Sequence, residues 1–256
     1  MSNMLEAKGI NFAYPSVNVL SDVDITVQAH ESHVVIGPNG AGKTTLFKVL
    51  SGEMFPQSGT VQYNGENVTG LDAWERVHRG IGRTFQVARL FAEQSVLNNV
   101  VLALECRERI KGTSHGAWWR LHSSPELVDE AMSRLAQYGL AVRSKDEAAN
   151  LSHGDKKRLE LLMTLALNPK LIMLDEPTAG MAPDDRRSVV DMINRLREDE
   201  GLTLLLTEHD MEVVFGLATR LTVLNQGQVI ASGDPETVRH DPMVHEIYFG
   251  KGGAHA

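Results

Sequence analysis

The chain reads Gly37-Pro38-Asn39-Gly40-Ala41-Gly42-Lys43-Thr44 immediately after the short apolar run 32–36. This spacing fits G-x-x-x-x-G-K-[ST], and from Lys43 onward apolar residues recur at helical intervals up to Gly52. Glycines let backbone amides approach phosphate oxygens without a Cβ in the way, and a helix that follows points the positive end of its dipole at an anion. The stretch therefore predicts a phosphate-binding loop between a strand and a helix, against the alternative of a glycine turn with a solvated lysine.

The loop pattern also assigns roles to individual side chains. Lys43 is expected to hold the β- and γ-phosphates of a nucleotide, and the Thr44 hydroxyl is expected to bind Mg²⁺. The other candidate nucleotide-binding residues are Gly37, Pro38, Asn39, Gly40, Ala41, Gly42 and Thr45.

A second apolar run ends in two acids. Residues 171–174 read Leu-Ile-Met-Leu and are followed by Asp175 and Glu176. A triphosphate site needs a carboxylate strand beside its phosphate loop. Asp175 is expected to orient Mg²⁺ and its waters, and Glu176 to polarise the attacking water as the general base. The alternative is an ordinary solvated strand end.

The patterns around these motifs alternate between strand and helix. Such alternation predicts an α/β fold with a mainly parallel sheet covered by helices. Strands are expected over 5–14, 23–28, 32–36, 171–174, 203–207, 221–224 and 228–231, and helices from Lys43 and over 183–197 and 211–218.

The strand signal fades between residues 96 and 150, where apolar residues recur at helical spacing. We expect a helical subdomain over 87–150, inserted into an α/β core formed by 1–86 and 151–256, with 1–256 as one domain. Trp118 and Trp119 lie in a Gly- and Ser-containing stretch that favours a loop between helices. These tryptophans either pack in the insert or lie exposed for a partner, and composition leaves both open.

Charge and composition exclude several classes of protein. Lys and Arg number 25 and Asp and Glu 33, so the net charge is 25 − 33 = −8, which argues against nucleic acid as the main partner. The single Cys106 allows no intramolecular disulfide, and no zinc-site spacing is present. The uncharged stretches fall short of the roughly 20 apolar residues of a spanning helix, and the start shows no secretory signal. A reducing, cytoplasmic setting is expected.

A further segment, Leu151-Ser152-His153-Gly154-Asp155, lies about 20 residues ahead of the acidic strand. With it, the ordered motifs resemble those of the ATP-binding subunit of an ABC transporter, whose signature is L-S-G-G-Q. His153 and Asp155 replace a glycine and the glutamine of that signature. The resemblance implies a P-loop NTPase core with an antiparallel β portion and an inserted helical subdomain, and ATP hydrolysis as the activity. From the residues alone, Ser152 is also a suitable N-cap for an amphipathic core helix.

The resemblance implies that two chains pair head to tail around ATP. Ser152 and Gly154 of one chain would contact the γ-phosphate that Lys43 of the other chain holds. The loop 180–184, which departs from the usual sequence of the family, would cross the dimer interface and carry Asp184.

Three further positions follow from the same resemblance. Gln86 would reach Mg²⁺ and the attacking water, and the alternative is a polar strand end. His209 would contact the γ-phosphate, and the alternative is a structural histidine. Tyr14 would stack on adenine, and the alternative is a buried strand tyrosine.

Finer detail resembles the ATPases of branched-chain amino-acid importers, in particular the longer of their two paired subunits. This implies a subunit that powers the uptake of branched-chain amino acids or of a related small polar solute such as urea, amides or aromatic acids. It would lie on the cytoplasmic face of the plasma (inner) membrane as a peripheral protein. The segments that carry the likeness are 83–86, 89–91, 95–100, 175–181 and 247–250.

The partners implied are membrane-spanning permease subunits, a second ATP-binding subunit of the same or a different kind and, indirectly, a periplasmic or extracellular solute-binding protein. A coupling helix of the permease would dock on residues 87–100. Two alternatives remain: a soluble phosphoryl transferase, and a non-transport ABC-type ATPase that acts on DNA or ribosomes. The net charge counts against the latter.

Overall fold

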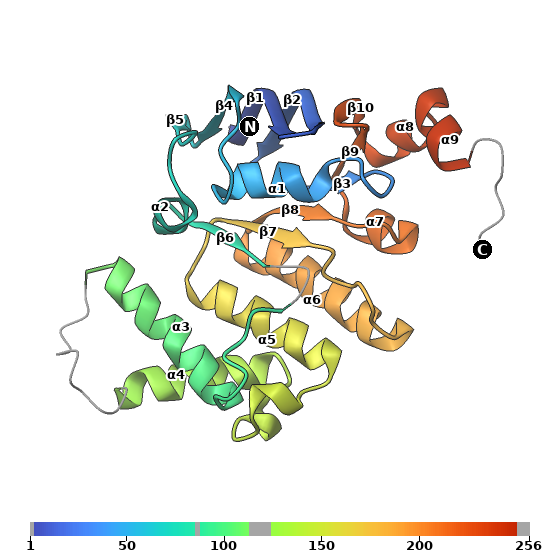
Figure 1. The fold of residues 1–256 in the computed structure, drawn as a ribbon. Helices are drawn as coiled ribbons and strands as arrows, with labels where there is room; N and C mark the ends of the chain where they lie inside the picture. Colours follow the sequence, from blue (N-terminus) through green and yellow to red (C-terminus); the bar gives the residue numbers. More distant parts are fainter. Residues whose placement is uncertain (1–2, 85–87, 113–123, 250–256) are drawn as a thin grey trace.

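The fold is built from two β-sheets with one helix between them (Figure 1). The computed structural model describes residues 3–84, 88–112 and 124–249. The helix between the sheets is α1 (Lys43–Ser51), and its apolar side chains pack in one cluster with residues of both sheets. The first sheet is antiparallel, in the order β2 (Val17–Gln28), β1 (Asn3–Tyr14), β4 (Ser58–Tyr63) and β5 (Glu66–Asn67).

The second sheet carries the expected parallel strands. The strands β3, β6, β7, β8 and β9 run parallel, and β10 is antiparallel to β9 at one edge. Because the carboxyl ends of parallel strands meet at one edge, the residues that follow β3, β7 and β8 are brought together there. The order is β10 (Gln228–Gly233), β9 (Arg220–Asn225), β3 (Ser32–Ile36), β8 (Thr203–Thr207), β7 (Leu171–Asp175) and β6 (Ile81–Arg83).

Both faces of the second sheet are covered, which explains its continuous apolar strands. In β3, Val35 packs in the cluster with α1, while Val34 and Ile36 pack in the cluster on the other face. Side chains alternate between faces along a strand, so one short run serves both cores. Helices α6 (Pro183–Glu200) and α7 (Met211–Leu217) cover that other face.

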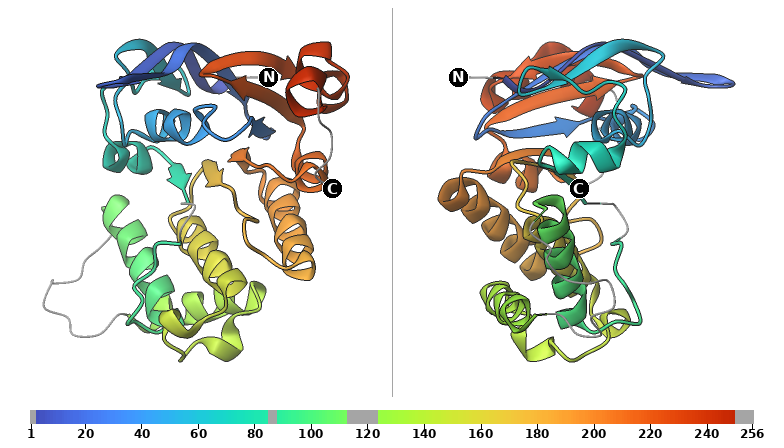
Figure 2. Two further views of the ribbon diagram at one scale, coloured as in Figure 1. Left: turned by 45° about the vertical axis from the view of Figure 1, so that its right-hand side comes forward. Right: turned by 90° about the vertical axis from the view of Figure 1, so that its left-hand side faces the viewer.

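Within its described residues, the region 96–150 forms two main helices, which pack with a third that follows it, at the end of the molecule remote from β1 and β2 (Figure 2). Each begins at a serine whose hydroxyl accepts a hydrogen bond from a backbone N–H, the usual N-cap. The helices are α3 (Val96–Ile110), α4 (Pro125–Gln137) and α5 (His153–Ala166), with 3₁₀ turns η1 (Ala141–Arg143) and η2 (Ala148–Asn150). Leu159 and Leu162 of α5 pack with α3 and α4, while Leu161 and Leu165 pack under the sheet. The subdomain boundaries expected at 86/87 and 150/151 stay a prediction.

The structure adds elements that the periodicity did not indicate. The strand expected at 23–28 begins earlier, at Val17, and β4, β5 and β6 are short or rich in polar residues. Helices α2 (Ala73–His78), α8 (Pro235–Arg239) and α9 (Pro242–Phe249) are too short for a clear helical period. Within the described ranges, no helix combines the length and apolar character needed to cross a bilayer.

Candidate nucleotide and hydrolysis site

The glycine-rich loop joins the end of β3 to the start of α1, and the packing around it explains its glycines. A Cβ on Gly37 would lie 2.2 Å from the carbonyl oxygen of Leu224. Gly42 has φ +104°, and a Cβ there would lie 2.9 Å from a side-chain carbon of Leu20. Any larger residue at either position would displace the loop. Pro38, Asn39, Gly40 and Thr44 are exposed at the loop surface, while Gly37, Ala41, Gly42 and Thr45 are buried.

Lys43 begins α1 and folds over the loop. Its Nζ donates to the carbonyl oxygens of Gly37 (2.6 Å) and Pro38 (3.2 Å). Burial lowers the pKa of the Lys43 ammonium, and the nearby carboxylates of Glu176 and Asp175 oppose that shift. The phosphate loop, its lysine and the two acids therefore belong to one electrostatic site.

The two acids stand where β7 ends, beside β8. Asp175 is buried, and its Oδ1 accepts a hydrogen bond from Thr207 Oγ1 at 2.8 Å. The Glu176 backbone N–H donates to both Oγ1 (3.1 Å) and the carbonyl oxygen (3.2 Å) of Thr207. Glu176 also has φ +48°, an uncommon conformation for a residue with a side chain. Thr207 thus ties both acids to the next strand.

His209 lies next to these acids. It follows β8 by two residues, and its Nδ1 is 4.0 Å from Glu176 Oε1. Its side chain is 61% exposed, so the ring is open to a ligand at the sheet edge. The structure therefore brings together three of the predicted residues, Lys43, Glu176 and His209, from three separate segments.

The residues present fit a magnesium ion by their chemistry. Mg²⁺ takes oxygen ligands, usually one or two protein oxygens together with substrate phosphates and waters. Asp175 uses one carboxylate oxygen on Thr207, its other oxygen lies 3.7 Å from Arg83 Nη2, and Thr44 is exposed. Among the described residues, no group of three or more His, Cys, Asp or Glu side chains forms a metal cage. Asp175 and Thr44 can therefore supply protein oxygen ligands for Mg²⁺, and phosphate and water oxygens would complete its coordination.

Comparison with known proteins decides the family. The family profile described as "ABC transporter" matches residues 20–179. The chain belongs to the ABC transporter family. It is an ATPase, the ATP-binding subunit of an ABC transporter, as the ordered motifs predicted.

Relatives cover nearly the whole chain. The high-affinity branched-chain amino acid transport ATP-binding protein LivG of Salmonella typhimurium is 35% identical over 253 residues, 97% of this chain and 98% of LivG. The lipopolysaccharide export system ATP-binding protein LptB of Haemophilus influenzae is 32% identical over 249 residues, 97% and 98% of the two chains. A crystal structure of an ABC transporter cassette in its ADP conformation superposes with a TM-score of 0.84 at 31% identity, covering 98% of this chain and all of that one. The ABC ATPase fold is thereby confirmed.

The signature segment of this ABC subunit lies apart from its own phosphate loop. Ser152 caps α5 by accepting from the Asp155 N–H at 3.1 Å, and Gly154 is buried in the first turn. Helix α5 packs on the face of the six-stranded sheet opposite α1, which Figure 1 shows as helices below and above that sheet. Ser152 and Gly154 are thus not brought to Lys43 of the same chain.

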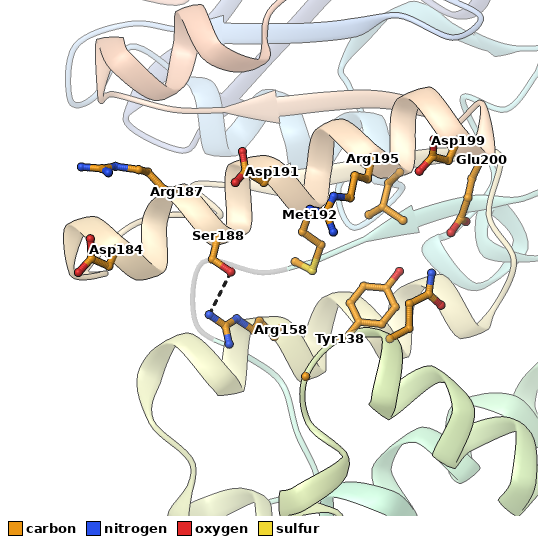
Figure 3. A pocket seen from close by; sticks show the side chains of 13 residues that line it. Tyr138, Arg158, Asp184, Arg187, Ser188, Asp191, Met192, Arg195, Asp199 and Glu200 are labelled. Carbon is orange, nitrogen blue, oxygen red and sulfur yellow. Dashed lines mark hydrogen bonds between the residues drawn. The ribbon is translucent and has the colours of Figure 1, made fainter.

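Helix α5 is instead tied to the loop and helix that follow the acids. The Nε2 of His153 lies 3.1 Å from the carbonyl oxygen of Ala179. Arg158 points from α5 toward α6, where it donates to Ser188 Oγ at 3.3 Å (Figure 3) and to Asp185 Oδ1 at 3.4 Å. The histidine that replaces a signature glycine therefore contacts the segment leading from Glu176 to α6.

Several predicted positions are peripheral or lie outside the described residues. Tyr14 is 39% exposed at the end of β1, which excludes the alternative of a buried strand tyrosine. Its ring packs edge-on against Phe12, and its hydroxyl lies 3.6 Å from Met54 Sδ. Gln86, Trp118 and Trp119 lie outside the described residues, so their roles stay predictions.

The sequence reasoning missed three side chains that hold the site together. Thr207 orients both acids, and Arg83 Nη2 lies 3.7 Å from Asp175 Oδ2. Glu208 is fully buried between the segments that carry Glu176 and His209. In the sequence, Glu208 stands out only as a charged residue directly after an apolar strand. The residues that it contacts follow from the order of the strands and not from the sequence.

Proposed function

We propose that this ATP-binding subunit drives an importer for branched-chain amino acids or a chemically related small polar solute. The proposal is supported by the likeness to LivG across nearly the full length of both chains. The likeness to LptB favours a second candidate, lipopolysaccharide export, at slightly lower identity. Its partners would be permease subunits that receive it on residues 87–100 and, indirectly, a solute-binding protein. The subunit would then be peripheral, on the cytoplasmic face of the membrane.

The observation that carries the hydrolytic part of the proposal is the convergence of Lys43, Glu176 and His209 at one sheet edge. In this scheme Lys43 and the loop amides bind the β- and γ-phosphates, and Glu176 takes a proton from the attacking water. His209 contacts the γ-phosphate beside Glu176.

Magnesium would be held by Thr44 and Asp175, with Gln86 reaching it, and would supply charge neutralisation on the phosphate oxygens. The residues of this chain perform the remaining tasks. Thr207 holds Asp175 in place, and Tyr14 stacks on the adenine ring at the exposed end of β1.

A second chain would complete the site. Ser152 and Gly154 stand at the N-terminus of α5, where backbone N–H groups and the helix dipole favour a phosphate. Because their own Lys43 lies across the sheet, the phosphate they meet would be bound to a partner subunit. ATP would stabilise the closed pair, and hydrolysis would remove the γ-phosphate that joins the two chains. The permease would convert that closure into solute movement.

Reconstitution with the membrane subunits tests the transport proposal. ATP turnover in proteoliposomes would be measured with leucine, isoleucine, valine, urea, an aromatic acid and lipopolysaccharide, each with its solute-binding protein where one exists. We expect stimulation by one of the small polar solutes. Stimulation by lipopolysaccharide alone, or purification with nucleic acid in place of permease subunits, would reject the importer proposal.

A further inference from the structure

The side chain of Glu208 is fully buried beside the hydrolysis site, although the adjacent His209 is largely exposed. A buried carboxylate is costly unless its oxygens accept hydrogen bonds. We therefore expect the Glu208 carboxylate to have a structural or mechanistic role. The hydrogen-bond donors around it show which segments it connects.

One oxygen of Glu208 holds the loop that follows the general base. Oε1 accepts from the Thr178 backbone N–H at 3.1 Å and from the Thr178 hydroxyl at 2.6 Å. Thr178 is buried and lies two residues beyond Glu176. The same loop is closed by a hydrogen bond from the Ala179 N–H to the Glu176 carbonyl oxygen at 3.1 Å. The position of Glu176 is thus linked to the Glu208 carboxylate through a short, internally bonded segment.

The other oxygen of Glu208 holds the histidine. Oε2 accepts from the His209 backbone N–H at 3.2 Å and lies 4.0 Å from His209 Nδ1. His209 Nδ1 is also 4.0 Å from Glu176 Oε1. His209 Nδ1 is therefore equally distant from two carboxylates, the buried one of Glu208 and the partly exposed one of Glu176.

A buried cation from another element lies near these acids. Lys157 of α5 is buried, and its Nζ is 3.9 Å from Glu160 Oε2. Burial lowers the pKa of Lys157, and four carboxylates oppose that shift, those of Glu160, Asp175, Glu176 and Glu208. Both oxygens of Glu208 face donors in the hydrogen bonds described above.

We propose that Glu208 is a positioning residue, which fixes the loop of Glu176 and the backbone of His209 to each other through the two oxygens of one buried carboxylate. The inference rests on the proposed roles of Glu176 and His209 in hydrolysis. Glu208 itself touches neither nucleotide nor water in this scheme. Glu208 keeps the positions of the general base and of the histidine fixed relative to each other. The exposed groups of the site can then exchange their contacts without moving these two residues apart.

Three variants test this proposal in the full chain, and two of them form a matched pair at Thr178. Glu208→Gln keeps the size of the side chain and one acceptor oxygen for Thr178, but it turns an N–H₂ group toward the His209 N–H. Thr178→Val removes the hydroxyl bond, whereas Thr178→Ser keeps it and serves as the matched control. We expect Glu208→Gln and Thr178→Val to lower kcat on the order of 10- to 100-fold, since misplacement of a catalytic group has effects of that size. The KM for ATP and the equilibrium binding of ATP should stay within about twofold, and Thr178→Ser should restore kcat.

The outcomes separate this inference from the proposed function. Parental kcat in Glu208→Gln and Thr178→Val, with strong losses in Glu176→Gln and His209→Ala, overturns the positioning role alone. Parental kcat in Glu176→Gln and His209→Ala overturns the assigned roles and with them this inference. A loss in Glu208→Gln that comes with an equal loss of ATP binding or of the folded fraction marks a purely structural residue and also overturns the proposal.

Discussion

The residue proposed as the general base, Glu176, is held in an uncommon backbone conformation. Glu176 has φ +48°, and such a conformation in a residue with a side chain costs on the order of 1 kcal/mol. Two hydrogen bonds from its N–H to Thr207 hold it there, directly after the buried Asp175. The turn separates the two carboxylates, so that Asp175 stays in the sheet while Glu176 reaches toward His209.

Glu176→Gln should bind ATP but hydrolyse it slowly. The amide has nearly the same shape but cannot take a proton from water, so we expect kcat to fall on the order of 10²-fold or more. ATP affinity should stay close to the parental value because Lys43 and its loop are unchanged. Glu212→Gln, an exposed acid on α7, is the control. Near-parental turnover in Glu176→Gln would show that another group serves as the base.

Local patterns could predict the residues that we propose to contact the nucleotide, but not those that position them. The loop 37–44 and the pair Asp175-Glu176 are contiguous, and their chemistry follows from the order of the residues. Thr207 and Arg83 act on Asp175 from strands β8 and β6, on either side of β7. The sequence carries no sign of that neighbourhood until the strand order is known.

Helix α1 depends on a buried arginine from α2. Arg76 is fully buried, and its Nη1 donates to the carbonyl oxygens of Val49 (2.9 Å) and Leu50 (2.7 Å) in the last turn of α1. Its Nη2 donates to Val68 (2.7 Å) and Thr69 (3.2 Å). Burial lowers the pKa of Arg76 to about 10, which still leaves the guanidinium charged at neutral pH.

Arg76→Met should destabilise the chain strongly. Several buried carbonyl groups lose their donor at once, and each costs about 1–3 kcal/mol, so the free energy of unfolding should fall by at least about 3 kcal/mol. Urea unfolding measures the change. Arg79→Met, which removes a partly exposed ion pair with Glu66, should cost much less. Equal losses in the two variants would show that Arg76 does not brace α1.

Helices α3 and α4 are joined by a charge cluster. Arg107 of α3 donates from Nη1 (2.6 Å) and Nη2 (2.8 Å) to the two oxygens of Glu130, and Arg134 donates from Nε at 2.9 Å. The hydrogen bond from Arg107 has the largest effect and lowers the pKa of Glu130, burial opposes that shift, and the hydrogen bond from Arg134 adds to it, so that the pKa falls to about 2. This stabilisation is present above the ordinary pKa near 4.5 and is lost as the pH falls through about 2.

Glu130→Gln should therefore loosen the contact between the two helices in a pH-dependent way. Because Glu130 is about one-third exposed, we expect a loss of only about 1–2 kcal/mol in the free energy of unfolding near neutral pH. The difference from the parent should narrow between pH 4.5 and about 2. Asp129→Asn, an exposed acid one residue earlier, is the control. A difference that does not change with pH would contradict the assignment of the stabilisation to the Glu130 carboxylate.

Strands and helices were predictable from the sequence where the burial of their residues follows a simple pattern along the segment. The continuous apolar runs of β3, β7 and β8 indicated buried parallel strands, and the helical period indicated α6. Strand β4 reads Ser-Gly-Thr-Val-Gln-Tyr and buries only Val61 and Tyr63, so its identity depends on pairing with β1. Helix α2 is anchored by Arg76, because the carbonyl groups that accept the hydrogen bonds of this side chain lie outside the helix.

The molecule as a whole presents the two features that we propose to bind nucleotide on opposite faces of one sheet. Helix α1 and Lys43 lie on the face that packs against the antiparallel sheet, and α5 with Ser152 lies on the other. One chain cannot bring both features to the same phosphate while its sheet stays intact. Two chains related by a twofold axis can, because each then supplies one feature to each of two equivalent sites.

This arrangement predicts that two inactive variants restore activity when mixed. Lys43→Ala should weaken ATP binding, and Ser152→Asp should keep the helix cap while it places a negative charge against the triphosphate. In a mixed dimer, one site combines the intact Lys43 of one chain with the intact Ser152 of the other, while the second site carries both defects. With random pairing, the mixture should regain up to about a quarter of the parental ATP turnover, well above either variant alone. Ser152→Asn, a neutral cap, controls for the cap itself. A mixture that shows only the average of the two variants would place both groups in a site made by a single chain and reject the head-to-tail pair.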